Sequence, residues 1–313
     1  MKRRKFIKQV AVGSTLSMLP FSWITGKENQ GLLFPQSAKA ADRGKPLIKC
    51  AFSYPPTSRL KEEGYFSYPG SSFDAEGRQQ RYTRKLKGME RDLGIDIDFE
   101  GDPLDKSDSV TRFINEVKET KPNGLVLFPF KESHFANIER IVQETQVPSV
   151  VLATQGVILV ADVRSLYNES ETYMINSLNN LEAVEYGLKM INAAFKMSKK
   201  TILNIDYSER KEERVPVIGT RVVTVPIERF MEVYDQIDVT GEVQRCANNW
   251  WNTAEMIKQP DKENTVNASR AYYALKRMIK EEQADAMMMN CLAGLRDREH
   301  VPPCMGFMRL RDE

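Results

Sequence analysis

Short apolar segments alternate with longer amphipathic segments along most of this 313-residue chain. Between residues 47 and 152 the pattern predicts four strands separated by three helices. The later strands, Leu125–Phe128 and Val150–Leu152, are apolar at every position, as strands of a parallel sheet covered by helices on both faces must be. Right-handed crossovers then predict a doubly wound, Rossmann-like α/β domain.

The first half of the chain carries clear element signals. Val110, Phe113, Ile114 and Val117 follow helical spacing, and Gly94 is typical of a helix end. The expected order is strand Leu47–Phe52, loop Ser53–Phe73, helix Ala75–Leu93, strand Ile95–Phe99, a helix capped by Ser107 or Asp108, strand Leu125–Phe128, helix Phe135–Val142, strand Val150–Leu152, strand Val157–Val160, loop Tyr167–Tyr173 and helix Leu178–Phe195.

A second α/β unit is expected from about residue 199. Its elements are strand Ile202–Ile205, a charged loop Ser208–Arg214, strand Val222–Val225, helices Ile227–Ile237 and Gly241–Ile257, a helix capped by Thr265 or Asn267, and strand Ala286–Met289. We therefore predict two Rossmann-like, doubly wound parallel-sheet domains, 41–198 and 199–313, with the second incomplete. No strand is followed by G-x-G-x-x-G and there is no Walker loop, which argues against a typical dinucleotide or triphosphate binder.

The first forty residues are predicted to be an export signal. Arg3 and Arg4 open a basic cluster, a weakly apolar run interrupted by Pro20 follows, and Ala38 and Ala40 form a small-x-small cleavage pattern. Paired arginines of this kind resemble a twin-arginine (Tat) signal. The alternative is a membrane anchor, but the run is shorter than the roughly 20 residues that a spanning helix needs. An exported, extracytoplasmic protein and the Tat translocase as a partner are expected.

Removal of this signal changes the charge balance. Residues 1–40 contain seven basic side chains and one acidic one, so the net charge falls from +2 to about −4. A mildly acidic chain with interspersed signs lacks the basic footprint of a nucleic-acid-binding protein. Four cysteines follow the signal: Cys50, Cys246, Cys291 and Cys304. Export permits a Cys291–Cys304 disulfide, and the alternative is four free or buried thiols.

Candidate site residues lie in loops that follow strands. In an open α/β sheet ligands bind at the carboxyl ends of the strands, so Arg59, Tyr65 and Tyr68 are candidate ligand contacts; the alternative is a solvated or subunit-contact loop. His134 and His300 are the only histidines, and any Ser-His-acid system must use one of them. His134, after the strand Leu125–Phe128, either reaches a ligand or is a surface or capping residue.

Two further patterns have both a binding and a packing interpretation. Trp250 and Trp251, flanked by asparagines, suit stacking on a sugar ring, but neighbouring helical residues point about 100° apart and at least one of them must pack. Met287–Met289 is interpreted as a core strand rather than a metal-binding methionine cluster.

Three segments carry a family resemblance. They are ADAMMMNCLAGL at 284–295, the Pro303–Leu310 turn into a helix, and VIGTRVVTVP at 217–226. Together with the order of the domains, they resemble the L-fucose/L-arabinose isomerase-like family. Members of this family are longer and carry a further C-terminal domain that supplies part of the metal and substrate site. The resemblance therefore implies that this chain is an N-terminal fragment.

The resemblance also implies a chemistry. Family members interconvert an aldose and a ketose through an ene-diolate, with Mn²⁺ or another divalent metal on two sugar oxygens. Glu313 is the residue nearest the family's acidic positions and is the candidate catalytic residue, while His300 and Arg309 join Arg59 and Tyr65 as candidate substrate contacts. The metal ligands are expected mostly outside this chain, and self-association is expected.

The interpretation that follows is an exported sugar isomerase-like protein. A different class fits the same two α/β domains: a non-catalytic periplasmic carbohydrate-binding protein whose lobes close on a small-molecule sugar. A third interpretation is that the chain keeps the family's fold without its activity.

Overall fold

The computed structural model describes residues 44–63, 74–154, 157, 163–177, 179–258, 261–291 and 303–313. Two sheets with their own helices account for these residues, and we refer to them as the first and the second unit. The predicted export signal, Arg3, Arg4, Ala38 and Ala40 included, lies outside the described residues, as do Tyr65, Tyr68 and His300. None of the helices in the described ranges combines the length and apolar character that a membrane crossing requires.

The first unit is built on five parallel strands in the order β2-β1-β3-β4-β5. Cys50 of β1 lies opposite Phe99 of β2 and Val126 of β3, which fixes the register at the centre of the sheet. This order confirms the doubly wound α/β fold expected from the sequence. The strands are β1 (Leu47–Ser53), β2 (Asp96–Phe99), β3 (Gly124–Pro129), β4 (Ser149–Ala153) and β5 (Thr172–Asn176).

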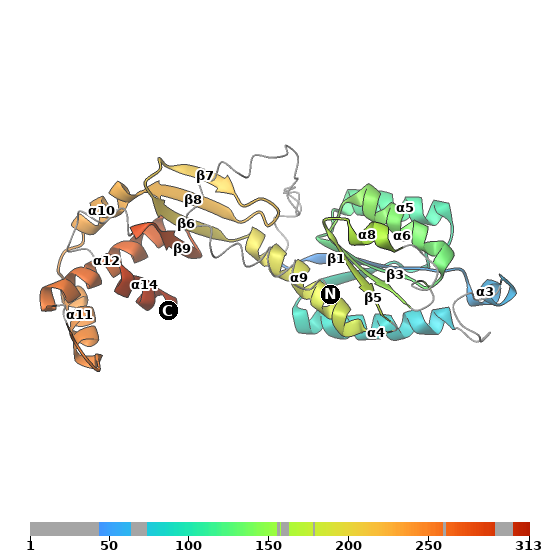
Figure 1. Ribbon diagram of the computed structural model, residues 1–313, viewed down its shortest axis with the longest axis horizontal. Helices are drawn as coiled ribbons and strands as arrows, with labels where there is room; N and C mark the ends of the chain where they lie inside the picture. The colour runs from blue at the N-terminus through green and yellow to red at the C-terminus, as the bar shows by residue number, and fades with distance from the viewer. Residues whose placement is uncertain are drawn as a thin grey trace. The chain divides into compact units, whose positions relative to one another are not determined.

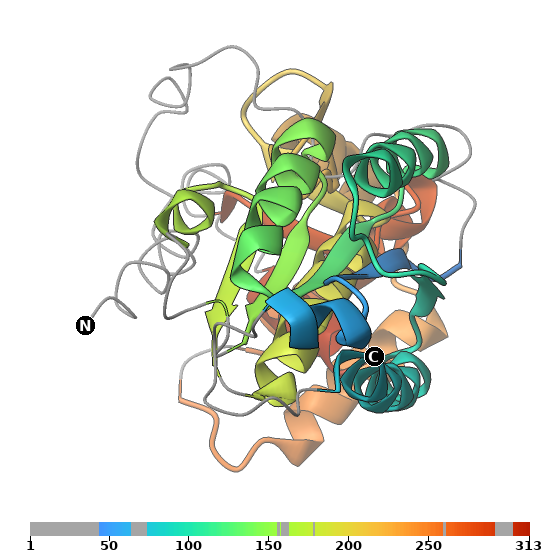
Figure 2. The ribbon, with the colours of Figure 1, turned by 90° about the vertical axis from the view of Figure 1, so that its right-hand side faces the viewer.

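Helices cover both faces of the first sheet (Figures 1 and 2), as right-handed crossovers on the two sides of β1 require. One face packs against α4 (Ala75–Leu93) and α9 (Leu181–Ser198) around Phe52, Phe128 and Leu188. The other face carries α5 (Ser107–Thr120), α6 (Phe135–Thr145) and the short α8 (Arg164–Tyr167). Both inner faces are apolar, which explains why β3 and β4 are buried at every position.

One lysine interrupts this apolar interior. The Lys49 side chain on β1 is 1% exposed, and its Nζ donates to Asp98 Oδ2 at 2.8 Å and to Glu116 Oε1. Burial by itself would lower the pKa of Lys49, but the hydrogen bonds to Asp98 and Glu116 outweigh burial and raise it. The ammonium therefore stays charged inside the unit, paired with two carboxylates that are themselves about half exposed.

The second unit has a smaller, mixed sheet in the order β7-β8-β6-β9. Strands β6 (Thr201–Asp206), β8 (Arg221–Pro226) and β9 (Ala286–Met289) are parallel, and β7 (Lys211–Arg214) joins the edge antiparallel to β8. Its core residues, Leu203, Ile205, Val223 and Val225 among them, meet helices α10 and α12. Its helices are α10 (Ile227–Asp235), α11 (Gly241–Thr253), α12 (Lys262–Glu281) and α14 (Cys304–Arg311).

Several local expectations differ from the structure. The second sheet, expected to be parallel, has the antiparallel edge strand β7. Lys106 precedes α5 in place of Ser107 or Asp108, and Asp261 caps α12 in place of Thr265 or Asn267. The loop expected over 53–73 contains helix α3 (Thr57–Glu63), and the loop expected over 167–173 runs into strand β5. The charged loop expected over 208–214 contains β7, whose charges are typical of an exposed edge strand and conceal its strand character. Of the strand expected over 157–160, only Val157 is described, and it is helical.

Candidate functional site

Three loops meet at the carboxyl edge of the first sheet, where β1 and β3 lie side by side and the chain leaves them in opposite directions. Such a switch point is where open α/β sheets bind ligands. Arg59 comes from α3 after β1, Asp105 from the loop after β2, and His134 from the 3₁₀ turn η4 (Glu132–His134) after β3. In Figure 2 α3, in blue, lies at the front of the first unit.

The loop after β2 is fastened to the end of β1. The Ser53 hydroxyl donates to the Leu104 carbonyl at 2.6 Å, and the Leu104 N–H donates to the Phe52 carbonyl at 2.8 Å. Asn137 of α6 donates to the Ser53 hydroxyl at 3.2 Å. Because Ser53 and Leu104 are fully buried, these bonds fix the backbone next to Asp105 and set the direction in which its carboxylate leaves the sheet.

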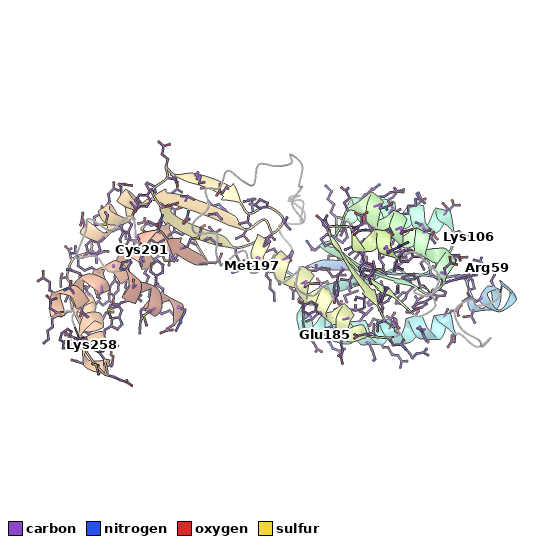
Figure 3. The ribbon with its side chains drawn as sticks, in the orientation of Figure 1. Arg59, Lys106, Glu185, Met197, Lys258 and Cys291 are labelled. Atoms are coloured by element: carbon purple, nitrogen blue, oxygen red, sulfur yellow. The ribbon has the colours of Figure 1, made fainter. Side chains whose placement is uncertain are left out.

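Helix α3 is anchored at both sides of Arg59. Leu60 is buried in the core of the first unit. The Thr57 N–H donates to Glu76 Oε1 at 2.9 Å, and the Thr57 hydroxyl also donates to Glu76. These contacts tie the start of α3 to the first turn of α4 and place the Arg59 guanidinium on Asp105. Figure 3 labels Arg59 and Lys106, the residue after Asp105, at the same end of the first unit.

Asp105 is the centre of the cluster. Its Oδ1 accepts a hydrogen bond from Arg59 Nη2 and lies 3.1 Å from His134 Nε2. Burial by itself would raise the pKa of Asp105, whose side chain is 14% exposed, but the hydrogen bonds from Arg59 and His134 outweigh burial and lower it. Among the described residues, no hydrogen bond reaches its second oxygen, Oδ2.

His134 extends the cluster to the start of α6. Burial lowers the pKa of His134, and the nearby charges of Lys131 and Arg59 act in the same direction, while Asp105 opposes them. His134 Nδ1 lies 3.2 Å from the hydroxyl oxygen of Ser133, which is exposed. The cluster therefore presents a carboxylate, a guanidinium, a neutral imidazole and a hydroxyl at one sheet edge.

A smaller polar group lies at the corresponding edge of the second sheet. Asp206 ends β6, and its Oδ1 accepts from the Tyr207 N–H at 2.9 Å and from Asn290 Nδ2 at 3.1 Å. Asn290 directly follows β9, the neighbour of β6. The group has fewer charged members and is more exposed than the Asp105 cluster, so we take the latter as the candidate site.

The structure brings together two residues that the sequence analysis proposed for the site, but in an ion-pair cluster of the second unit. Lys276 of α12 donates to Glu313 Oε2 at 2.8 Å, Tyr272 donates to Oε1, and Arg309 Nε of α14 lies 3.3 Å from Oε1. The Lys276 hydrogen bond, followed by that from Tyr272, lowers the pKa of Glu313. Both oxygens of Glu313 thus tie α12 to the end of the described chain.

The tryptophans also take part in packing. Trp250 meets Tyr272 edge-on, with ring centroids 6.4 Å apart, and the Lys262 ammonium lies 5.8 Å from the Trp251 ring centroid. The ring contact favours the packing interpretation for Trp250, and Trp251, which carries the lysine contact, is partly exposed. Met288 on the edge strand β9 is 48% exposed, so Met287–Met289 forms a strand only partly covered by the core.

The described residues do not fit a divalent metal centre, because no group of three or more His, Cys, Asp or Glu side chains converges among them. All four cysteines are free thiols, so the Cys291–Cys304 disulfide is absent and the alternative of free thiols holds.

Asp105 and Ser133 were missed by the sequence analysis. Both residues lie in loops that follow strands, and this position could have marked them as candidates for the site. Neither stands in a recognised motif, and the partners of Asp105 are 29 and 46 positions away along the chain.

Comparisons with known proteins leave the family of this chain undetermined. No family model matches it, and no curated protein matches it. Among solved structures, a sugar ABC transporter from Yersinia enterocolitica subsp. enterocolitica 8081 is 13% identical, with a TM-score of 0.24, over 86% of this chain and 68% of that chain. A likeness at this TM-score carries no argument about function.

Proposed function

We propose that the protein binds a small polyhydroxylated ligand, a sugar or sugar derivative, at the carboxyl edge of its first sheet. The observation that carries the proposal is the state of Asp105. One carboxylate oxygen is held by Arg59 and His134, and the other has no bond from the described residues. A carboxylate oxygen fixed in this way accepts a ligand hydroxyl strongly, since charge-assisted hydrogen bonds exceed neutral ones.

Arg59 complements Asp105 in this role. Its side chain is 37% exposed, so Arg59 orients Asp105 and is still partly accessible to solvent. Adjacent sugar hydroxyls each donate one hydrogen bond and accept others, and an acceptor beside a planar donor matches such a pair. Fixing both groups before the ligand arrives reduces the ordering cost of binding.

A binding role agrees with the export expected from residues 1–40, since an extracytoplasmic protein meets free sugars and glycan fragments. Aldose–ketose isomerisation remains a prediction from the family resemblance. Glu313, its candidate catalytic residue, is engaged by Lys276, Tyr272 and Arg309. No group of three or more His, Cys, Asp or Glu side chains converges among the described residues.

Calorimetric titration of the purified chain with pentoses, hexoses, 6-deoxyhexoses, uronic acids and polyols tests the proposal. We expect saturable binding of at least one sugar class, and a loss of affinity of about 10- to 100-fold in Asp105→Asn, because a hydrogen bond to a charged group contributes about 1.5–3 kcal/mol. Arg59→Met is expected to weaken binding in the same way.

Arg229→Met is the control, because Arg229 is likewise an ion-paired arginine, bonded to Glu232 and Glu281, but lies in the second unit. Its affinity should equal that of the unsubstituted protein. The proposal fails if no sugar class binds, or if Asp105→Asn and Arg59→Met, shown to be folded by urea titration, bind as tightly as the control.

A further inference from the structure

Ser133, His134 and Asp105 form a continuous hydrogen-bonded chain. Ser133 Oγ lies 3.2 Å from His134 Nδ1, and His134 Nε2 lies 3.1 Å from Asp105 Oδ1. His134 is 7% exposed and Asp105 is largely covered, whereas Ser133 is exposed. The reactive end of the chain thus faces solvent while the supporting groups are shielded.

The bonding partners settle which imidazole nitrogen carries the proton. Asp105, held ionised by Arg59, offers only acceptors, so the nitrogen facing it, Nε2, is the N–H donor. A neutral imidazole then has its lone pair on Nδ1, where the Ser133 hydroxyl donates. The lowered pKa of His134 agrees with a neutral ring at pH 7.

The geometry points to Ser133 as a nucleophile for acyl transfer, with His134 as its general base and Asp105 as the residue that orients the imidazole. Serine, histidine and a carboxylate, with the imidazole between the other two, make up the set that hydrolyses esters on several unrelated folds. Here the two ring nitrogens exchange roles, because Ser133 contacts Nδ1 and Asp105 contacts Nε2. The roles are recognised by geometry, and the order of the residues along the chain differs from fold to fold.

The position of Ser133 supports this assignment. It lies between β3 and α6, in a strand-to-helix turn at the carboxyl edge of a parallel sheet. In α/β-hydrolases a sharper strand-to-helix turn at the same edge exposes a serine hydroxyl above the sheet. The residues Phe130-Lys131-Glu132-Ser133-His134 do not form a G-x-S-x-G motif, which is why the sequence pattern does not indicate the nucleophile.

The reaction balances without a cofactor. Ser133 Oγ attacks the carbonyl carbon of a small ester while its proton passes to His134 Nδ1. The imidazolium returns the proton to the leaving alcohol as the ester C–O bond breaks, which leaves an acyl-serine. Water, deprotonated by the same nitrogen, hydrolyses the acyl-serine to a carboxylic acid and free Ser133.

The inference goes beyond sugar binding and does not depend on it. Its test is therefore covalent labelling with a fluorophosphonate ester, followed by intact-mass measurement and peptide mapping. We expect one phosphonyl adduct per chain, on Ser133. Ser133→Ala should remove the adduct, and Ser107→Ala, which changes an exposed serine of α5, should retain it.

Asp105→Asn is expected to slow labelling at least 10-fold, since general-base assistance is worth roughly 10²- to 10⁴-fold. Asp105→Asn could also slow labelling by disturbing the fold, so a second readout is needed. The imidazole ¹⁵N shifts of His134, assigned by comparison with His134→Gln, supply it. The shifts should report the Nε2–H tautomer, and Asp105→Asn should change that tautomer.

Three results would overturn the inference. They are no adduct on the folded, unsubstituted protein; an adduct on another serine in place of Ser133; and an Asp105→Asn variant that is folded, labels at the original rate and keeps the same tautomer. Labelling needs no sugar, so these outcomes are distinct from a failure of the titrations described under Proposed function.

Discussion

His134 Nε2 lies 3.1 Å from Asp105 Oδ1, and this contact joins the loop after β3 to the loop after β2. Neither residue lies in a helix or strand interior. The bond depends on Ser53 and Leu104, which fix the Asp105 backbone, and on the start of α6, which fixes His134. A site at the sheet edge is therefore coupled to the folding of the first unit.

This coupling predicts that acid destabilises the protein through His134. The pKa of His134 is lowered in the folded state, chiefly by burial, while the unfolded chain has a pKa near 6.5. As the pH falls below about 6.5, the unfolded state takes up a proton that the folded state refuses, so stability is lost. Urea midpoints at pH 7.5 and 5.5 should differ more for the unsubstituted protein than for His134→Gln.

Asp105 does not contribute in that window. Its folded pKa lies below the usual value, so the stability it contributes is present above about pH 4 and is lost at more acidic pH. Equal midpoint differences for the unsubstituted protein and His134→Gln would contradict the assigned role of His134.

Replacing Lys49 should cost less stability than replacing both of its carboxylate partners. Replacing Lys49 with Met removes a buried charge and leaves Asp98 and Glu116, both about half exposed, free to hydrate, so the free energy of unfolding should change by no more than about 1 kcal/mol. The double variant Asp98→Asn/Glu116→Gln leaves the buried ammonium without a counter-charge and should lose about 3–5 kcal/mol.

Chemical denaturation of the Lys49 variants provides the measurement. Asp96→Asn is the control, because Asp96 lies on β2 with Asp98 and pairs with Lys45 across 3.9 Å. Both side chains of this pair are exposed, where ion pairs contribute little. If Lys49→Met lost more unfolding free energy than the double variant, the unpaired buried ammonium would not be the main cost.

At Gly187 we expect close packing to outweigh the higher helix propensity of alanine. A Cβ at Gly187 on α9 would lie 2.6 Å from Val150 Cγ2 and 3.0 Å from Tyr173 Cδ1, so Gly187→Ala forces α9 away from β4 and β5. We expect a loss of about 1–3 kcal/mol. Gly88→Ala on α4, where a Cβ meets no atom within 4 Å, should instead gain about 0.5–1 kcal/mol.

Urea denaturation measures both effects: the midpoint should fall for Gly187→Ala and rise for Gly88→Ala. Gly187→Ala without destabilisation would mean that α9 does not sit against β4 and β5 at this distance.

Thiol reactivity should follow burial. Cys50 is buried in the sheet, and burial strongly raises its pKa, so an aromatic disulfide reagent should modify it only after unfolding. Cys304 is exposed at the start of α14 and should react first, with Cys246 and Cys291 intermediate. Mass mapping of a reaction time course measures the order. Rapid modification of Cys50 in the folded protein would contradict the sheet register.

Much of the first unit follows from local sequence patterns. The all-apolar runs at Leu125–Phe128 and Val150–Leu152 can be buried only with helices on both faces, and the structure places them as β3 and β4. Elements with polar surfaces were harder to predict. Strand β7 consists of four charged residues, and α3 lies within a stretch rich in Ser, Pro and Gly, so neither has an apolar period to reveal it.

Sequence by itself determined the α/β class and the alternation of strands and helices, because periodicity and turn residues act over a few neighbouring positions. It also indicated the carboxyl edge of the first sheet as the place to look for a site, because open α/β sheets bind ligands at that edge. Only the tertiary structure decided that Arg59, Asp105 and His134 meet there, and that Glu313 pairs with Lys276. These contacts join residues up to 46 positions apart, and they depend on strand order and loop direction, which no local pattern encodes.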